Sequence, residues 1–223
     1  AATEMADATA QAEIIRSAQL WISKNRTDLA RQHIDKLLLI QPDSPWGLAA
    51  LGDINLREGR TAEAHQQLAR LRQRAPDHPA TRELTLLTRL FGADSQKLAT
   101  MRLLAQAGRL QEAAALARGL FPDGPPVSSA MALEYYQIMG HAAPATDPAM
   151  DQALQQQYQR TGDVHYRILA LQRQLQRGTS TPTMLAEIAQ MAAAPGTDEP
   201  AVRGLWPGCA PAAWSEPGSC LCR

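Results

Sequence analysis

Residues 45–78 read PWGLAALGDINLREGRTAEAHQQLARLRQRAPDH, and this stretch decides the fold. Residues 11–44, immediately before it, follow the same pattern. The positions that recur 34 residues apart are Ala18/Gly52, Asn25/Gly59, Ala30/Ala64, Ile34/Leu68, Leu37/Leu71 and Pro42/Pro76. Small or apolar residues, a turn former and a closing proline thus keep their places from one stretch to the next.

A period of 34 residues is typical of tetratricopeptide (TPR) repeats, in which each repeat is a pair of antiparallel helices. One pair cannot bury its apolar face alone, so neighbouring pairs stack into a solenoid with a concave inner surface. We therefore predict an all-α, TPR-type solenoid of helical hairpins that follows a right-handed superhelix. Such a surface is suited to binding rather than to chemistry.

The repeat pattern also assigns structural roles to single positions. In the second repeat, we expect Gly52 and Ala64 to let the two helices of the pair approach closely, and Gly59 to form the turn between them. Asn25 takes that turn position in the first repeat, because asparagine tolerates the same conformation, and Trp21 is expected in the core. The structural positions are Trp21, Ala30, Pro42, Gly52, Gly59, Ala64, Pro76, Gly108 and Ala113.

Two more repeats are expected further along the chain. Residues 94–127 fit the template well, whereas residues 148–181 fit it in degenerate form, with Arg167 where a small residue is expected. Together with the first two repeats they predict one helical array over residues 1–195.

Two helices outside the repeat phase are expected to interrupt this array. Leu84, Leu87 and Leu90 have helical spacing and predict a helix at about 80–91. A second extra helix is predicted at about 129–139. Since neither belongs to a hairpin, we expect both to lack repeat partners, to bury less area per residue and to act as hinges.

The charge of the chain argues against nucleic-acid binding. It has 22 lysines and arginines and 22 acidic residues, so its formal net charge is zero, whereas an electrostatic grip on phosphates needs a basic surface. Arg70, Arg72 and Arg74 form a local cluster, which we interpret as a solvated helix face rather than a binding patch.

The sequence gives two expectations about compartment. No stretch approaches the roughly 20 apolar residues of a membrane-spanning helix, so we expect no membrane insertion by this segment. The chain begins Ala1-Ala2-Thr3 without an initiator methionine. This is consistent with a secreted protein whose signal has been removed or with a shortened chain, and the sequence does not separate the two.

Residues 196–223 differ in character from the rest. All three cysteines lie here, at Cys209, Cys220 and Cys222, among Gly, Pro and Trp. A zinc or redox role for Cys220-Leu221-Cys222 would need a second ligand pair or a histidine, which this tail lacks. We interpret the tail as a frame-shifted or vector-encoded ending that is disordered or loosely attached.

Catalytic and metal-binding motifs are not found in the sequence. There is no Gly-x-Ser-x-Gly elbow, no phosphate-binding loop that ends in Gly-Lys-Ser/Thr, and no His-Glu-x-x-His. The five histidines lack metal-ligand spacing on one helix face. We therefore expect a protein without catalytic residues, metal or cofactor.

Candidate binding residues are the side chains on the first helix of each pair that point away from the second helix. By repeat phase they are Gln19 with Ile15 and Ser23, then Trp46, Asp53 and Arg57, then Arg102 and Gln106. Trp46 could stack on a sugar ring, but packing against the preceding repeat is the favoured interpretation, because tryptophan is buried on average.

Four segments of the chain resemble one family. These segments are DLARQ (28–32), KLLLIQP (36–42), LFPDGPP (120–126) and LEYY (133–136). They are similar to the N-terminal TPR region of bacterial cellulose synthase operon protein C, over about residues 11–140. The resemblance implies a periplasmic segment of a cellulose exporter, attached in the full-length protein to an outer-membrane pore. It also implies that cellulose synthase subunits in the periplasm are partners.

Three hypotheses about function follow. The first is a scaffold that links the inner-membrane synthase to the outer-membrane pore through protein–protein interaction. The second is direct binding and guidance of the nascent glucan, which would need exposed aromatic residues, whereas aromatic residues make up only 4% of the chain. The third is an unrelated TPR co-chaperone or adaptor, which would need a Lys- and Asn-lined groove that Gln19, Asp53 and Arg102 do not supply.

Overall fold

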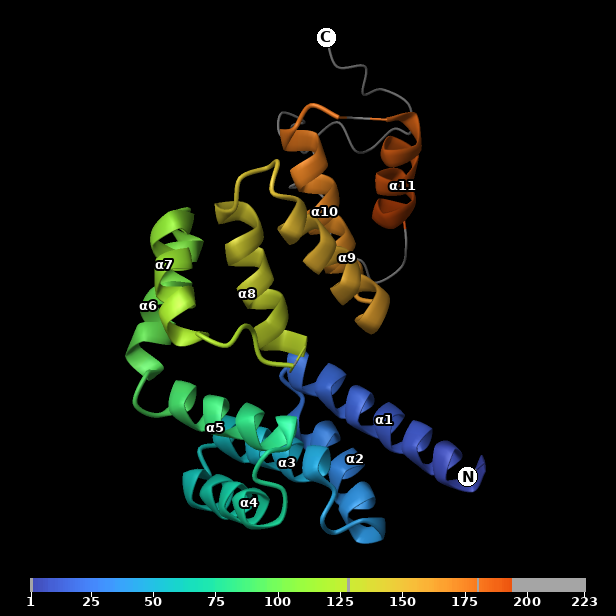
Figure 1. The fold of residues 1–223 in the computed structure, drawn as a ribbon, viewed down its shortest axis with the longest axis vertical. Coiled ribbons are helices and arrows are strands. Elements are labelled where there is room, and N and C mark those ends of the chain that lie inside the picture. Colours follow the sequence, from blue (N-terminus) through green and yellow to red (C-terminus); the bar gives the residue numbers. More distant parts are fainter. Residues whose placement is uncertain (1, 128, 180, 194–223) are drawn as a thin grey trace. The chain divides into compact units, whose positions relative to one another are not determined.

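The computed structural model describes residues 2–127, 129–179 and 181–193, and the regular structure in these ranges is entirely α-helical (Figure 1). The predicted all-α fold is therefore confirmed for this part of the chain. The helices are α1 (Ala2–Ser23), α2 (Thr27–Ile40), α3 (Pro45–Arg57), α4 (Thr61–Arg74), α5 (Pro79–Phe91), α6 (Ser95–Gln106), α7 (Leu110–Leu120), α8 (Ser129–Ala142), α9 (Pro148–Thr161), α10 (Val164–Gln176) and α11 (Pro182–Ala193). The predicted tail, with its three cysteines, lies outside the described residues.

Four helical hairpins are closed by the same device. The turns of α1–α2, α3–α4, α6–α7 and α9–α10 each contain one residue with positive φ, namely Asn25 (57°), Gly59 (75°), Gly108 (74°) and Gly162 (69°). These residues occupy one position of the repeat. A left-handed backbone at this point reverses the chain between two helices, which glycine and asparagine tolerate.

Several helices start at sites that the sequence marks clearly. Pro45, Pro79 and Pro148 occupy the first turn of α3, α5 and α9, where a missing backbone N–H costs nothing. At the start of α3, the Ser44 hydroxyl accepts a hydrogen bond from the Gly47 N–H at 3.3 Å. Local chemistry thus fixes where these helices begin.

The chain divides into two compact units, Ala1–Ala142 and Ala143–Arg223, whereas the sequence predicted one array over residues 1–195. Each unit is described by itself. The predicted right-handed superhelix concerns how all the repeats stack and stays a prediction.

The core of the first unit uses the small residues of the repeat. Ala30, Ala64 and Ala113 are fully buried where the two helices of a pair meet. Trp21 packs against the core around Ala18 and Ile34 but remains half-buried, with the Lys24 ammonium 5.4 Å from its ring centroid. It borders the core instead of filling its centre.

Gly52 has a different neighbour from the one the repeat pattern predicted. A Cβ atom at Gly52 would lie 2.5 Å from a terminal methyl of Leu84, which belongs to α5. The glycine therefore lets α5 approach α3, which the repeat pattern did not predict. The position of Gly52 in the repeat predicted a close approach of another helix to α3, but it did not predict that this helix is α5.

Helix α5 is also not the poorly buried helix that the sequence predicted. It packs mainly against α3 and secondarily against α4 (Figure 1). Ala80, Leu84, Leu87 and Leu90 are at most 1% exposed. Because α3 supplies a full packing surface, α5 belongs to the core although it has no hairpin partner of its own.

The second predicted extra helix is α8, which extends to Ala142. It packs against α7 and also lies beside α1 (Figure 1). Met131 and Ile138 are buried in the main core of the unit. Residues from the two ends of this unit are therefore in contact.

The second unit contains the hairpin α9–α10, which lies in the predicted degenerate repeat, and the helix α11. No separate helix was predicted at the position of α11. Ile168 and Leu171 of α10 pack against Met184 and Ile188 of α11. Arg167, at a position where the repeat expects a small residue, forms two hydrogen bonds with Glu187, at 2.5 and 2.6 Å. An ion pair thus connects two helices where repeats normally have close apolar packing.

Candidate functional site

A narrow cleft lies on the first unit where α1, α3 and α5 meet. Gln19, Trp46 and Asp53 line it together with Glu83 of α5. The first three are predicted binding residues, and each comes from the first helix of its pair. The cleft volume is about 20 Å³, which is close to the space that one water molecule needs. The cleft cannot hold a sugar ring as it stands.

Asp53 is the most deeply buried charged residue of this cleft, with 3% of its surface exposed. Its carboxylate accepts a hydrogen bond from Arg57 Nε at 2.9 Å. Burial raises the pKa of the Asp53 carboxyl, and the Arg57 charge only partly opposes this shift. Burial of the charged Asp53 carboxylate therefore costs free energy, and the ion pair with Arg57 reduces this cost.

Arg57, another predicted binding residue, is committed to intramolecular contacts. It forms the ion pair with Asp53, and its guanidinium carbon lies 5.6 Å from the centroid of the Phe91 ring. This stacking connects the end of α3 to the end of α5. Arg57 therefore positions Asp53 and holds the two helices together, and it does not line the cleft.

Trp46 makes a ring contact that the sequence did not predict. Its ring meets the His78 ring edge to face, with centroids 5.8 Å apart. His78 lies just before α5, and its Nδ1 accepts a hydrogen bond from the Ala80 N–H at 3.1 Å. Trp46 thus packs toward the helix that follows and is not presented as an open platform for a sugar.

Glu83 was missed by the sequence analysis. It is 8% exposed, and its Oε2 accepts a hydrogen bond from the Val127 N–H at 2.8 Å. Its position in α5 contained a signal, because it lies three residues after Ala80 and four before Leu87, in the buried stripe of the helix. A charged residue in such a stripe is expected to have a buried partner.

Arg102 and Gln106, the predicted binding residues of the third repeat, lie apart from the cleft on α6. Arg102 binds the Glu134 carboxylate of α8 through two hydrogen bonds, at 2.6 and 3.0 Å, and this raises the pKa of the Arg102 guanidinium. Gln106 is exposed near the end of α6. The six predicted binding residues therefore do not form one site.

Two of the other residues assigned to the groove have ordinary structural positions. Ile15 is half-buried on α1, and the exposed Ser23 hydroxyl donates a hydrogen bond to the Leu20 carbonyl at 2.7 Å. Neither of them lines the cleft.

The described residues offer neither a metal site nor a membrane span. Within these ranges, no cluster of three or more His, Cys, Asp or Glu side chains is placed to hold a metal ion. The helices in the same ranges are too short or too polar for one of them to cross a bilayer.

The hairpins, their turn residues and their repeat period define a helical tandem-repeat protein of the TPR type. No family model matches the chain. The chain is 33% identical over 150 residues to cellulose synthase operon protein C of Xanthomonas axonopodis pv. citri. This aligned region covers 66% of the chain and 10% of that protein. The chain is 32% identical over 145 residues to the protein of the same name from Escherichia coli K12, with 65% and 12% covered.

A solved structure agrees with these relatives. It is the crystal structure of the flexible tandem repeat domain from the C subunit of bacterial cellulose synthase. The chain superposes on it with a TM-score of 0.65 and 32% identity, covering 88% of the chain and 80% of that domain. The chain therefore belongs to the cellulose synthase operon protein C family. It spans about a tenth of the length of the curated relatives that it matches.

Proposed function

We propose that this chain is a scaffold segment of the bacterial cellulose synthesis and secretion complex. It would lie in the periplasm and help to link the inner-membrane synthase to the outer-membrane export pore through protein–protein interaction, without a catalytic role. The observation that carries the proposal is the match, at 32% identity, to the tandem repeat domain of a cellulose synthase component. TPR arrays in general act through binding surfaces of stacked helices.

The cleft of α1, α3 and α5 supports a protein partner more than a glucan chain. Its volume of about 20 Å³ leaves no room for a glucose ring, and the Trp46 ring is engaged by His78. Gln19, in contrast, is half-buried at the edge of the cleft, where a partner side chain can reach it. We place the contact with the synthase there.

Photo-crosslinking tests this proposal. A photoreactive residue at Gln19, in the full-length parent protein of a cellulose-secreting cell, is expected to crosslink to another protein of the cellulose synthase complex. The matched control is Gln66, an exposed glutamine on α4 that does not line the cleft. Equal crosslinking at both sites, or none to synthase proteins while cellulose is secreted, would contradict the proposal.

A fluorescence titration separates the scaffold from the glucan alternative. Replacing Trp206 and Trp214 by phenylalanine leaves Trp21 and Trp46 as the tryptophans of the chain. Cellohexaose at millimolar concentration is expected to leave their emission unchanged, because the cleft is too small. A saturable change that Trp46→Ala abolishes would favour glucan guidance in its place.

A further inference from the structure

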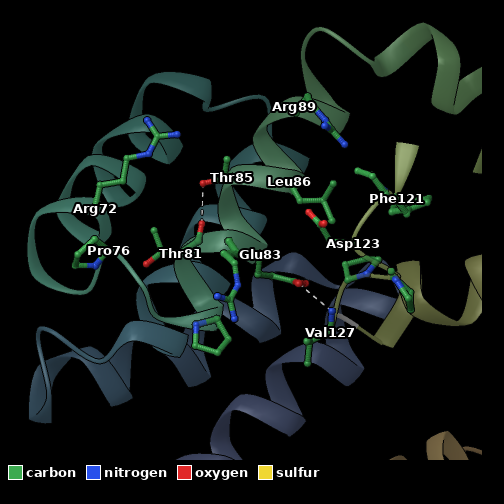
Figure 2. Close-up of a pocket in the computed structure, with 16 residues that line it drawn as sticks. Arg72, Pro76, Thr81, Glu83, Thr85, Leu86, Arg89, Phe121, Asp123 and Val127 are labelled. Atoms are coloured by element: carbon green, nitrogen blue, oxygen red, sulfur yellow. Dashed lines mark hydrogen bonds between the residues drawn. The ribbon is translucent and has the colours of Figure 1, made fainter. Parts of the chain in front are cut away.

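A much larger groove lies on another face of the first unit, along α5. Figure 2 shows α5 between two segments. One is the end of α4, with Arg72, and the turn after it, with Pro76, and the other carries Phe121, Asp123 and Val127. We call this space the strap groove and residues 121–127 the strap. The groove has a volume of about 570 Å³, which is within the range of known ligand pockets.

The strap groove exists because α5 has no hairpin partner. In the pairs α1–α2 and α3–α4, the second helix covers one side of the first. Helix α5 instead buries Leu84 and Leu87 against the core and exposes Arg82, Thr85 and Arg89. A second helix would cover this exposed side in a complete repeat, and here the strap covers only one edge.

The strap is fixed in place on this edge. Its Val127 N–H donates a hydrogen bond to the buried Glu83 carboxylate at 2.8 Å, and Arg89 Nη2 donates one to the Leu120 carbonyl at 2.5 Å. Phe121 is 4% exposed and meets the Tyr135 ring edge to face at 5.6 Å. The wall of the groove is therefore preorganised, which lowers the entropic cost of binding.

The lining of the groove contains three arginines, Arg72, Arg82 and Arg89, and two acidic residues, Glu83 and Asp123. In the described part of the chain, the Arg72 and Arg82 side chains have no ion-pair or hydrogen-bond partner, whereas the Arg89 side chain is paired with Asp94 at 3.0 Å. Of the two acidic residues in the lining, Glu83 accepts a hydrogen bond from the neutral Val127 N–H and keeps its charge, and Asp123 is the second carboxylate. Two guanidinium groups of the lining thus have no carboxylate partner among the residues that the structure describes.

The neighbours of Arg72 show that this arrangement is not a general property of α4. Arg70 and Arg74, two residues away on either side, both pair with Asp43, at 2.6 and 3.2 Å. They do not line the groove. The arginine cluster of α4 therefore divides into two structural residues and one residue that is available to a ligand.

We propose that the strap groove docks an acidic peptide segment of a partner protein. Guanidinium groups bind carboxylates with a planar fork of donors, so Arg72 and Arg82 would select glutamate or aspartate side chains. Leu86 and the prolines of the strap offer apolar contact to a neighbouring side chain of the peptide. A sugar chain fits less well, because Phe121 is buried and no stacking face is open.

This proposal rests on the proposed scaffold function in one respect, which is that the bound partner is a protein. The strap groove lies on a different face of the unit from the cleft of Gln19. The test uses the isolated full chain, so its outcome does not depend on the crosslinking result. If the peptide does not bind, the proposed contact at Gln19 is unaffected. If Gln19 does not crosslink to a synthase protein, the proposed peptide site in the strap groove is unaffected.

The experiment is a fluorescence anisotropy titration with a labelled peptide made of glutamate pairs separated by leucines. We expect saturable binding that weakens with added salt. The double variant Arg72→Gln/Arg82→Gln should weaken it about tenfold, a loss typical of two charge-assisted contacts. The matched control Arg70→Gln/Arg74→Gln, on the same helix, should leave the affinity unchanged. Circular dichroism checks that both variants fold.

Three outcomes would overturn the proposal. They are equal weakening by the two double variants, equal affinity for a peptide with glutamine in place of glutamate, and no saturable binding up to millimolar peptide. Cellohexaose in competition with the acidic peptide would instead assign the groove to glucan. Slower amide exchange in residues 121–127 when the peptide binds would locate it at the strap.

Discussion

The contact between α3 and α5 in the first unit and the hairpin α9–α10 in the second unit hold helices together by opposite means. The first is an apolar contact in which Gly52 makes room for Leu84. The second is built around Arg173, which is 2% exposed. Arg173 donates hydrogen bonds to the Asp151 carboxylate at 2.8 Å and to the carbonyls of Pro144 and Asp147 at 2.8 and 3.2 Å.

The difference shows what happens where the repeat pattern degenerates. Close packing depends on shape, and the addition of one carbon atom disturbs it. A buried arginine depends on the complete satisfaction of its donors and on the charge of its carboxylate partner. The two regions should therefore respond to different perturbations, and local measurements are needed because two compact units need not unfold together.

The largest effect is expected from Arg173→Met, which keeps an unbranched apolar stem but removes the guanidinium group with its charge and donors. Asp151 and the carbonyls of Ala143, Pro144, Ala145 and Asp147 would each lose a hydrogen-bond donor. The free energy of local opening of α9–α10 should fall by about 3 kcal/mol, as measured by hydrogen exchange of residues 148–176.

The matched control for this prediction is Arg177→Met. Arg177 also binds Asp151, but its side chain is 22% exposed, so it should matter less. Exchange in α3 and α5 should not change in either variant. If both variants had equal effects, or Arg173→Met had none, then Arg173 would not be the centre of the hairpin.

The next largest effect is expected from Gly52→Ala. The new methyl group would lie 2.5 Å from a terminal methyl of Leu84, so the buried Leu84 side chain or one of the two helices must shift. The free energy of local opening of α3 and α5 should fall by about 2 kcal/mol. Adding Leu84→Val, which withdraws the clashing atoms, should restore part of this loss, and a double-mutant cycle measures the coupling.

Gly119→Ala is the control for this second variant. Gly119 lies in α7, and a Cβ atom there would meet no other atom within 4 Å. The substitution should stabilise α7 by up to about 1 kcal/mol, because alanine has the higher helix propensity. If Gly52→Ala behaved in the same way, α3 and α5 would not be in close contact.

The sequence predicted local features well, because the repeat encodes them locally. The turn residues Asn25, Gly59 and Gly108 and the prolines that start helices act within a few residues of themselves. Periodicity also predicted that α5 is a helix. It could not tell that α5 packs against α3, since the spacing of apolar residues defines a helix face but not the surface that covers it.

The buried charged groups were less predictable. Arg173 lies in the run Gln172-Arg173-Gln174, which is typical of an exposed helix face, and its acceptors lie 22 to 30 residues earlier in the chain. Such contacts depend on the tertiary fold. Helix α11 was different, because Met184 and Ile188 at i, i+4 spacing after Pro182 are a local helix signal from which this helix could have been predicted.

The smallest expected effect is on pH dependence, and its sign should differ between the two regions. Partial burial of Asp151 would raise its pKa, but the hydrogen bonds and charges of Arg173 and Arg177 lower it below the usual value. Its stabilising contribution is therefore complete above the ordinary aspartate pKa of about 3.9 and is lost as pH falls through the lower pKa of the folded state. Burial raises the pKa of Asp53, so the region around α3 should gain stability as pH falls through that higher pKa.

Hydrogen exchange between pH 6 and about pH 3, corrected for the intrinsic exchange rate, tests this contrast. On acidification, α9–α10 should lose about 1 kcal/mol, the size of a partly screened ion pair, whereas α3 should become slightly more protected. Asp151→Asn should remove the first response and Asp53→Asn the second. A loss of protection in α3 that Asp53→Asn abolishes would mean that the ion pair with Arg57 outweighs burial. The cleft of α1, α3 and α5 would then contain a carboxylate that is stable in its charged form, and a cationic side chain would be the partner group that it favours.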